Sequence, residues 1–394
     1  MNCSAGVNGA DEDHSKDMQE HLNTAEPAQH VRVERQGHAG FITLNRPKAL
    51  NAMSLDMVRA LKTALEAFAQ DADVQMVAIR GTNKLGKPGS SDGLFGGFCA
   101  GGDIRYFHQA ALAGDNSLDD FFTEEYRLNH LIHHYPKPFV AFMDGVVMGG
   151  GMGISQGASL RLVTEHTRMA MPETIIGLFP DVGGGYFLSR CPGHIGEYLA
   201  LTGEVIAAQQ ALQYGLADVQ IEAAQQADLW AALGTQTFAN REQVEEWLAS
   251  QLGPKNTELI RPDAHIDGFF SLQRVKHILD ALEKAKDDRW AQKTAALLRK
   301  RSPLMLHVTL EQIRRARQMS LADDLRMERD MVHHCLYDRP GTASETVEGI
   351  RALAVDKDYA PKWNPARIED VKPGMADVFF VSPWAQESHP LRDF

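Results

Sequence analysis

The sequence predicts an α/β protein in which a core of strands and helices is followed by a mainly helical C-terminal region. Short apolar runs that are typical of buried strands alternate with helix-forming segments up to about residue 220. In the following hundred residues, apolar residues recur mostly at helical spacing and few segments favour a strand. We therefore divide the chain into a polar leader, residues 1–30, a core, residues 31–225, and a C-terminal region, residues 226–394.

The elements of the first half follow from apolar spacing and from residues that break regular structure. Residues 41–44 are the first expected strand, which Pro47 ends because proline cannot donate a ladder hydrogen bond. A helix is expected over residues 54–70, with Ser54 as N-cap and apolar residues at steps of three and four. The apolar residues 76–79 predict a second, buried strand.

The next elements flank a long loop. Residues 82–97 are rich in glycine, serine, proline and lysine and are expected to be that loop. A helix is expected over residues 118–134 and a strand over residues 138–143. In the C-terminal region, Ser302 and Ser320 each precede a helical pattern and are expected to cap a helix.

Composition excludes several classes of protein. The chain has 394 residues with 40 basic and 52 acidic ones, a net charge of −12 that argues against a nucleic-acid binder. No apolar run approaches the roughly 20 residues of a membrane-spanning helix. The leader is acidic, unlike an Arg-rich transit peptide, so we expect a disordered leader in a cytoplasmic protein. The cysteines lie far apart without a CxxC pair, which predicts neither a disulfide framework nor a structural zinc site (Cys3, Cys99, Cys191 and Cys335).

Three further patterns point to functions that their context disfavours. Residues 81–88 nearly match a phosphate-binding P-loop, but Pro88 stands where the magnesium-binding hydroxyl belongs. Lys84 and Lys87 of this loop are candidates to meet phosphates as point charges, although a solvated surface loop is the simpler and favoured explanation. Ser155 lies in a GxSxG pattern, yet it follows the glycine-rich turn by about one helical turn, which disfavours a serine esterase. The sixteen histidines include no HExxH motif, so no metal site is expected.

Two glycine-rich segments stand where a helix begins. They are Ala100-Gly101-Gly102-Asp103 and Gly149-Gly150-Gly151. Backbone amides at a helix N-terminus point outward, and glycine lets a ligand approach them closely. One amide from each segment would make an oxyanion hole for a carbonyl oxygen that gains charge. Taken singly, each glycine run is also compatible with a flexible turn.

Two carboxylates follow in an apolar, glycine-rich stretch over residues 171–185. Burial would raise the pKa of Glu173 and Asp181, and two neighbouring carboxylates can take different roles in catalysis. Structural explanations remain open, because Glu173 fits the first turn of a helix and Asp181 fits an N-cap.

The motifs taken together resemble the crotonase (enoyl-CoA hydratase/isomerase) superfamily over about residues 31–225. The matching runs are Leu44-Asn45-Arg46-Pro47-Lys48-Ala49-Leu50-Asn51-Ala52, Phe98-Cys99-Ala100-Gly101-Gly102-Asp103-Ile104, Met148-Gly149-Gly150-Gly151, Leu201-Thr202-Gly203-Glu204 and Gly215-Leu216-Ala217-Asp218. The resemblance implies a crotonase-like spiral of ββα turns that binds an acyl-CoA thioester. It also implies that the amides of Gly102 and Gly150 hold the thioester oxygen.

Within the superfamily the chain resembles the 3-hydroxyisobutyryl-CoA hydrolases, and this likeness extends over nearly all of the chain after the leader. It rests on residues 171–185, on residues 121–129 and on Asp356-Lys357-Asp358-Tyr359-Ala360-Pro361-Lys362-Trp363-Asn364-Pro365. It implies substrate contacts at Glu125, Gly150, Glu173 and Asp181, and hydrolysis of a short branched 3-hydroxyacyl-CoA in valine breakdown. No metal or redox cofactor is implied, and a homo-oligomer is left open.

One departure from the hydratase pattern narrows the reaction. Gly153 stands where hydratases of the superfamily carry a second catalytic glutamate, so hydration is disfavoured. Isomerases of the superfamily can work with one glutamate at the position of Glu173, so an enoyl-CoA isomerase is the nearest alternative. A non-catalytic acyl-CoA-binding scaffold is a further alternative, which the paired carboxylates disfavour.

Overall fold

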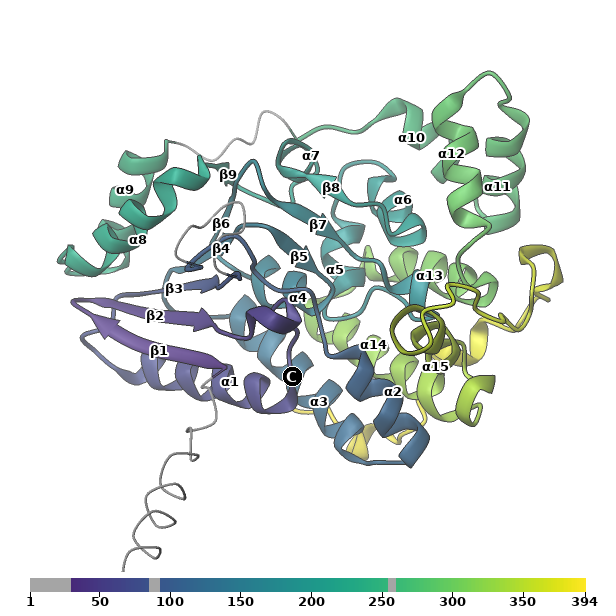
Figure 1. The fold of residues 1–394 in the computed structure, drawn as a ribbon, viewed down its shortest axis with the longest axis horizontal. Coiled ribbons are helices and arrows are strands. Elements are labelled where there is room, and N and C mark those ends of the chain that lie inside the picture. The colour runs from purple at the N-terminus through teal and green to yellow at the C-terminus, as the bar shows by residue number, and fades with distance from the viewer. Residues whose placement is uncertain (1–29, 85–92, 254–259) are drawn as a thin grey trace, which may run out of the picture. The chain divides into compact units, whose positions relative to one another are not determined.

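The main sheet has six strands in the order β1-β2-β3-β4-β6-β9 within the part of the chain described here (Figure 1). The computed structural model describes residues 30–84, 93–253 and 260–394. The strands β1 and β2 form an antiparallel hairpin, and the other neighbours in the sheet are parallel. The strand bounds are β1 Val31–Gln36, β2 Ala39–Leu44, β3 Met76–Gly81, β4 Phe139–Met143, β6 Leu160–Val163 and β9 Val219–Gln220.

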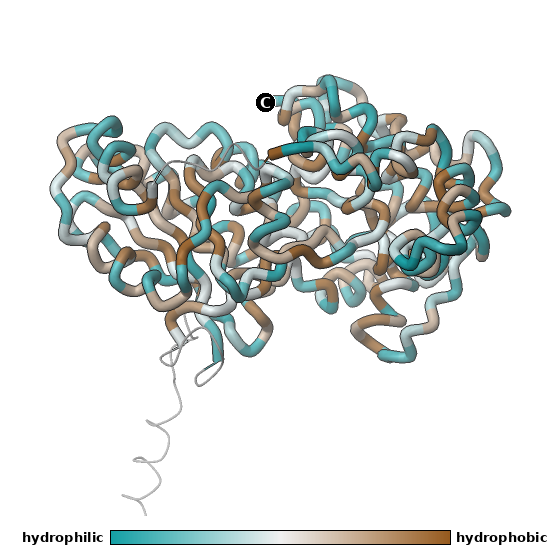
Figure 2. Tube along the Cα trace, turned by 90° about the horizontal axis from the view of Figure 1, so that it is seen from above, coloured by the Kyte–Doolittle hydropathy of each residue, from teal (hydrophilic) through white to brown (hydrophobic). Residues whose placement is uncertain are grey.

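Alternate residues of these strands enter two separate hydrophobic clusters, so the main sheet is buried on both faces. Ile42 and Ile79 belong to the larger cluster, which also holds α1 and α3. Their neighbours Phe41 and Ala78 belong to the second cluster, with Trp230 of α8. This arrangement is expected for a mostly parallel sheet with helices on its faces. In Figure 2 the hydrophobic segments run between more hydrophilic ones on either side.

A smaller sheet carries the segments that later form the site. It contains β5 (Val146–Met148), β7 (Arg168–Ala170) and β8 (Ile206–Ala207) in the order β5-β7-β8. The glycine-rich start of α4 (Gly150–Gln156) follows β5 directly. The short 3₁₀ helix Glu173–Ile176 follows β7 after two residues. Because β5 and β7 are parallel neighbours, the segments that leave their ends lie at the same edge of this sheet.

Helices account for most of the chain after β9. The remaining helices of the first half are α1 (Leu55–Gln70), α2 (Ile104–Ala113), α3 (Ser117–His133), α5 (Gly184–Ser189), α6 (Ile195–Thr202) and α7 (Ala208–Gln213). Those that follow are α8 (Gln226–Thr235), α9 (Arg241–Leu252), α10 (Ala264–Phe270), α11 (Val275–Lys284), α12 (Arg289–Leu298), α13 (Pro303–Ala316), α14 (Leu321–Tyr337) and α15 (Glu345–Ile350). None of the helices in the described part of the chain combines the length and hydrophobicity needed to cross a membrane.

Several predicted elements and caps are confirmed. The Ser54 hydroxyl accepts a hydrogen bond from the Met57 amide at the start of α1, as expected of an N-cap. Ser302 and Ser320 cap α13 and α14 in the same way. The sequence analysis missed β1 and α2. The strand β1 exposes five of its six residues, and its apolar alternation is limited to Val31 and Val33.

The described residues Val31–Phe394 belong to one compact unit. A boundary between core and C-terminal region near residue 225 therefore stays a prediction. The three C-terminal helices α13, α14 and α15 pack against the short helices after β7. Figure 1 shows these helices, in green and yellow-green, behind and beside α4 and α5.

Candidate active site

A cavity of about 230 Å³ lies where the two glycine-rich segments, α3 and the segment after β7 meet. It is mostly apolar, and three carboxyl side chains face into it. Its lining residues are Ala100, Gly101, Gly102, Ile104, Phe107, Phe122, Glu125, Met148, Gly149, Gly150, Pro172, Glu173, Ile175, Ile176, Leu178, Asp181, Val182 and Leu353. The structure thus brings together five residues that the sequence analysis singled out: Gly102, Glu125, Gly150, Glu173 and Asp181.

The two glycine-rich segments lie side by side at this cavity. A Cβ atom on Gly101 would come within 3.5 Å of the Gly150 nitrogen, and one on Gly150 would meet Glu125 Oε1 at 2.6 Å. Gly101 and Gly149 have positive φ angles of 99° and 48°, which favour glycine. Within the described residues, neither the Gly102 amide nor the Gly150 amide donates a hydrogen bond to a protein acceptor. Both amides are therefore available to a ligand.

Three carboxyl groups share the same buried space. Glu125 of α3 is 2% exposed, and Glu173 and Asp181 are each 6% exposed. Glu125 Oε1 and Glu173 Oε2 are buried and have no hydrogen-bond partner among the described residues. Unpartnered carboxylate oxygens are costly in an apolar interior, so these atoms point to a polar ligand or to bound water.

Burial raises the pKa of all three groups, and repulsion from Asp181 adds to the shift of Glu125 and Glu173. For Glu125 and Glu173, desolvation is the larger cause and the charge of Asp181 adds to it, so both pKa values lie well above the usual one. Burial raises the pKa of Asp181 to about 7, although a hydrogen bond from Tyr126 opposes the shift. Three such neighbours cannot all be ionised at once, and the set therefore holds protons near neutral pH.

Asp181 sits in a strained turn rather than at a helix cap. Its Oδ2 accepts a hydrogen bond of 3.0 Å from Tyr126, and the residue before α5 is Gly183. The N-cap explanation for Asp181 is therefore wrong. Val182 has a φ angle of 56°, which is rare for a β-branched residue and persists only where the surroundings enforce it. Glu173 does begin a helix, but a 3₁₀ helix with its carboxyl group in the cavity.

Of the two loop lysines, the structure describes only Lys84. Lys84 is exposed and does not line the cavity. Lys87 lies outside the described residues. Contact of Lys84 and Lys87 with CoA phosphates stays a prediction.

The position of Ser155 argues against a serine esterase. Its Oγ is fully buried and donates to the Gly151 carbonyl at 2.8 Å, inside α4. It does not line the cavity. In the described part of the chain, no group of three or more His, Cys, Asp or Glu side chains is arranged to hold a metal ion.

Gly153 is packed so closely that a larger residue would not fit. A Cβ atom there would lie 2.6 Å from Val182 Cβ and 2.9 Å from Asn129 Nδ2. Asn129 is buried one helical turn after Glu125, and neither atom of its amide has a partner among the described residues. The position at which hydratases carry a second glutamate therefore has no room for one in this structure.

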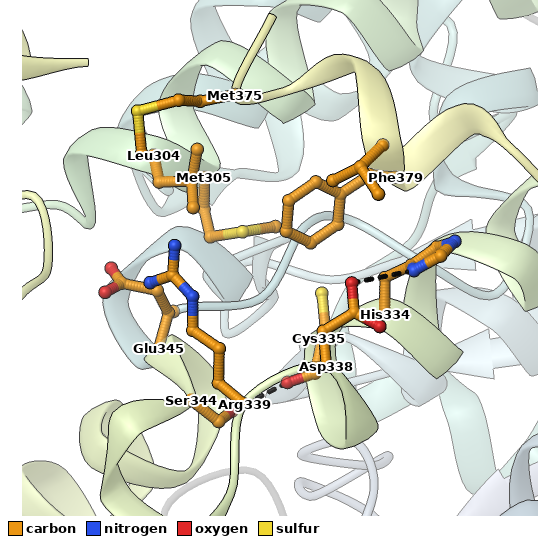
Figure 3. Close-up of a pocket in the computed structure, with 12 residues that line it drawn as sticks. Leu304, Met305, His334, Cys335, Asp338, Arg339, Ser344, Glu345, Met375 and Phe379 are labelled. Carbon is orange, nitrogen blue, oxygen red and sulfur yellow. Dashed lines mark hydrogen bonds and ion pairs between the residues drawn. The ribbon is translucent and has the colours of Figure 1, made fainter. Parts of the chain in front are cut away.

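The C-terminal helix α15 contacts the backbone at the end of the 3₁₀ helix that begins at Glu173. Thr346 Oγ1 of α15 donates to the Gly177 carbonyl at 2.8 Å, and Gly349 lets α15 touch the backbone of Ile176. Beside Gly177 lies a second cavity of about 60 Å³, in which Figure 3 shows the Arg339 side chain extending toward Glu345. None of the predicted site residues that the structure describes lines this second cavity.

Sequence reasoning missed three residues that contact the Asp181 turn. Tyr126 immediately follows the predicted Glu125, and that proximity was the available signal. Gln312 and Glu328 lie more than 130 residues beyond Asp181 and bind the backbone around it. Only the folded chain brings them near.

Comparison with known proteins identifies the family. The model of a family described as enoyl-CoA hydratase/isomerase matches residues 39–380. The chain belongs to this enoyl-CoA hydratase/isomerase family. Its curated relatives include the mitochondrial 3-hydroxyisobutyryl-CoA hydrolase of Gallus gallus, which is 37% identical over 92% of each chain. The enzyme of the same name from Rattus norvegicus is 37% identical over 93% of this chain and 91% of its own length.

Solved structures of the enoyl-CoA hydratase/isomerase family confirm the fold. A carnitinyl-CoA dehydratase from Mycobacterium thermoresistibile is 36% identical, with a TM-score of 0.77, over 90% of this chain and 96% of that one. An enoyl-CoA hydratase from Rhodobacter sphaeroides is 33% identical, with a TM-score of 0.75, over 90% and 98%. The predicted crotonase-like α/β fold with a helical C-terminal region is confirmed.

The predicted cytoplasmic location is contradicted by these relatives. The curated hydrolases from chicken and rat, and one from Xenopus tropicalis, are named as mitochondrial enzymes. The prediction rested on the composition of residues 1–30, which lie almost entirely outside the described part of the chain. The cellular location of a protein is decided by receptors that recognise a targeting signal. The chemistry of the folded site contains no such signal and therefore does not indicate the location.

Proposed function

We propose that this protein hydrolyses the thioester of a short branched 3-hydroxyacyl-CoA, with 3-hydroxyisobutyryl-CoA of valine catabolism as its substrate. The observation that carries the proposal is the convergence of two free glycine amides and three buried carboxyl groups on one cavity. Relatives named 3-hydroxyisobutyryl-CoA hydrolase match about 90% of the chain and support the same substrate. Hydrolysis consumes only water and changes no oxidation state, so the proposed reaction needs no redox cofactor, and the proposed steps use the glycine amides and carboxyl groups without a metal.

The amides of Gly102 and Gly150 form the oxyanion hole in this proposal. Gly150 is the first residue of α4, and the first amides of a helix have no partner inside it. They would donate to the thioester oxygen as it gains charge, a contribution of about 3 kcal/mol per donor in comparable enzymes. The positive φ angles of Gly101 and Gly149 keep the backbone open to the ligand.

Glu173 carries out the chemical step by one of two routes. In the first, its carboxylate attacks the thioester carbon, the carbon–sulfur bond breaks, and a mixed anhydride forms while CoA leaves as the thiolate. Water then hydrolyses the anhydride, which restores the Glu173 carboxylate and releases the proton that the CoA thiolate takes up. In the second, Glu173 takes a proton from water as the water oxygen attacks the thioester carbon, the carbon–sulfur bond breaks, and the departing CoA thiolate receives that proton from Glu173. Burial favours both routes, because a desolvated carboxylate is a stronger base and nucleophile.

Asp181 and Glu125 recognise the hydroxyl group of the acyl chain. Asp181 has a fixed orientation because Tyr126 binds its Oδ2, and Glu125 has a free oxygen at the polar end of the cavity. A buried site built to hydrogen-bond a hydroxyl rejects the analogue without it, because its polar groups are then left unpaired. We therefore expect hydroxylated acyl groups to be preferred.

The enoyl-CoA isomerase stays the second candidate, because the space around Gly153 excludes a second glutamate while Glu173 remains. An isomerase would move the double bond of a 3-enoyl-CoA without releasing CoA. The same packing at Gly153 argues against hydration in this chain, although two of its structural relatives are named hydratase or dehydratase.

Release of free thiol from 3-hydroxyisobutyryl-CoA, isobutyryl-CoA and crotonyl-CoA tests the proposal. The wild type and Glu173→Gln are compared at equal concentration, with a 3-enoyl-CoA as a fourth substrate. We expect thiol release that prefers the hydroxylated substrate and falls about 10²–10⁴-fold in Glu173→Gln. Double-bond migration without thiol release would reject hydrolysis in favour of the isomerase.

A further inference from the structure

The backbone on both sides of Asp181 is held by two buried side chains of the C-terminal helices. Gln312 of α13 donates from Nε2 to the Pro180 carbonyl at 2.7 Å. Glu328 of α14 accepts from the Gly183 amide at 2.7 Å and from the Gly185 amide at 2.9 Å. Gln312 also donates to Glu328 Oε1 at 3.1 Å, so the two side chains form one unit around the turn.

This contact is unlike an ordinary surface cap, because water cannot replace it. The side chains of Gln312 and Glu328 have no exposed surface. A buried carboxylate pays a large desolvation cost, which here is offset by two backbone amides and one side-chain amide. Removing it would leave amides unpaired in the interior.

The turn between these contacts is the strained one. Val182 has a positive φ angle of 56°, and such a backbone at a β-branched residue persists only where its surroundings over-determine it. Glu328 binds the amide of Gly183, the second residue after Asp181. We propose that Glu328, with Gln312, is a positioning residue that fixes the Asp181 carboxyl group for recognition of the acyl hydroxyl. The proposal rests on the proposed function through the role of Asp181.

The mechanism predicts a change in specificity rather than a uniform loss of activity. If Glu328 fixes Asp181, its replacement by glutamine leaves the amides of Gly102 and Gly150 and the Glu173 side chain in place. The hydroxylated substrate then loses its aligned hydrogen bond to Asp181, whereas isobutyryl-CoA has no hydroxyl group that could form one. A displacement near 1 Å is enough to cost about 10²-fold in rate.

The experiment measures kcat/KM for 3-hydroxyisobutyryl-CoA and isobutyryl-CoA in wild type, Glu328→Gln and Gln312→Ala. We expect the ratio of the two kcat/KM values to fall at least about 10-fold in Glu328→Gln and in the same direction in Gln312→Ala. Glu197→Gln is the matched control, because Glu197 is equally buried but lies on α6, where its carboxyl group binds Arg317 and does not line the cavity. Its ratio should stay within about 3-fold of the wild type.

The outcomes separate positioning from structural support. An equal loss on both substrates in Glu328→Gln, or the same change of ratio in Glu197→Gln, would overturn the proposal. If Glu328→Gln does not fold, Gln312→Ala decides, and an unchanged ratio there overturns it as well. A wild type that releases thiol without preferring the hydroxylated substrate would reject the role of Asp181, which is a failure of the proposed function itself.

Discussion

Tyr126 Oη donates a 3.0 Å hydrogen bond to Asp181 Oδ2, and both side chains are buried, with Asp181 lining the cavity of the candidate active site. The hydroxyl stabilises the ionised form of Asp181, whereas burial favours the neutral form and raises the pKa of Asp181 to about 7. The balance between these two effects places the titration of Asp181 near physiological pH.

Tyr126→Phe is expected to move the acidic limb of the pH–rate profile upward. The phenylalanine keeps the ring packing but removes the donor, so the ionised form of Asp181 loses support and its pKa rises above about 7. The kcat/KM for 3-hydroxyisobutyryl-CoA between pH 5 and 9 measures the shift, which we expect to be about 1 pH unit. The limb reports the coupled carboxyl groups together.

If the acidic limb of the pH–rate profile stays at the same pH in Tyr126→Phe, the ionisation of Asp181 does not determine that limb. Tyr135→Phe is the control, because the Tyr135 hydroxyl donates to the Leu65 carbonyl away from the cavity. It should lower stability slightly and leave the profile unchanged.

Asp181→Asn is expected to stabilise the protein at pH 8 while it removes the preference for hydroxylated substrates. The folded-state pKa of Asp181 lies above the ordinary value of 3.8, so the folded protein binds the proton more tightly than the unfolded chain. The resulting stability is fully present below about pH 4 and is lost as pH rises through about 7. Asparagine cannot ionise and avoids this loss.

The measurement is the free energy of unfolding at pH 5 and pH 8. The wild type should lose stability between these values more steeply than Asp181→Asn, by about 1–4 kcal/mol. A mutant that is less stable than the wild type at pH 8, with the same pH dependence, would contradict the raised pKa of Asp181.

Gly153→Ala is expected to destabilise the site, because the new Cβ would lie 2.6 Å from Val182 Cβ. Overpacking of this kind typically costs about 1–3 kcal/mol. Since Val182 follows Asp181, thiol release should fall together with the melting temperature. Gly268→Ala is the matched control, since Gly268 lies in α10 with open space around it and alanine favours a helix there.

The control should raise the melting temperature slightly and leave the rate of hydrolysis unchanged. Full activity and stability in Gly153→Ala would show that the site has room at this position. The packing argument against a second glutamate would then fail.

Ser155→Ala is expected to retain thiol release, because the hydroxyl is bonded to the Gly151 carbonyl and lies away from the cavity. Loss of one buried hydrogen bond should cost about 1 kcal/mol in the free energy of unfolding. Thiol release and urea unfolding measure the two effects. Activity lost in Ser155→Ala but kept in Glu173→Gln would return the serine esterase as the mechanism.

Local patterns in the chain were sufficient to predict much of the fold. Apolar spacing and Ser54 located α1 within its observed bounds, and Ser302 and Ser320 marked two helix starts in the C-terminal region. The strand β1 was missed because its residues are mostly exposed and its place in the sheet depends on pairing with β2. Such pairing is a tertiary fact that a one-dimensional pattern does not carry.

The sequence by itself determined which residues meet at the cavity. Gly102, Glu125, Gly150, Glu173 and Asp181 stand in motifs of fixed spacing, and their resemblance to the crotonase superfamily is confirmed by the comparisons. The roles proposed for them remain to be measured. Residue type and local spacing were sufficient for these residues. Gly102 and Gly150 stand in glycine-rich segments at helix starts, and Glu125 lies on the helix before the second of these segments. Glu173 and Asp181 stand together in one apolar stretch.

Only the tertiary structure decided how those residues are charged and held. The pKa of Asp181 depends on burial and on Tyr126, and the turn around Asp181 depends on Gln312 and Glu328. These effects arise from desolvation and from hydrogen bonds between segments more than 50 residues apart. Desolvation and hydrogen bonding act over a few ångströms in space. The distance between two residues along the chain does not show whether they lie that close in the fold.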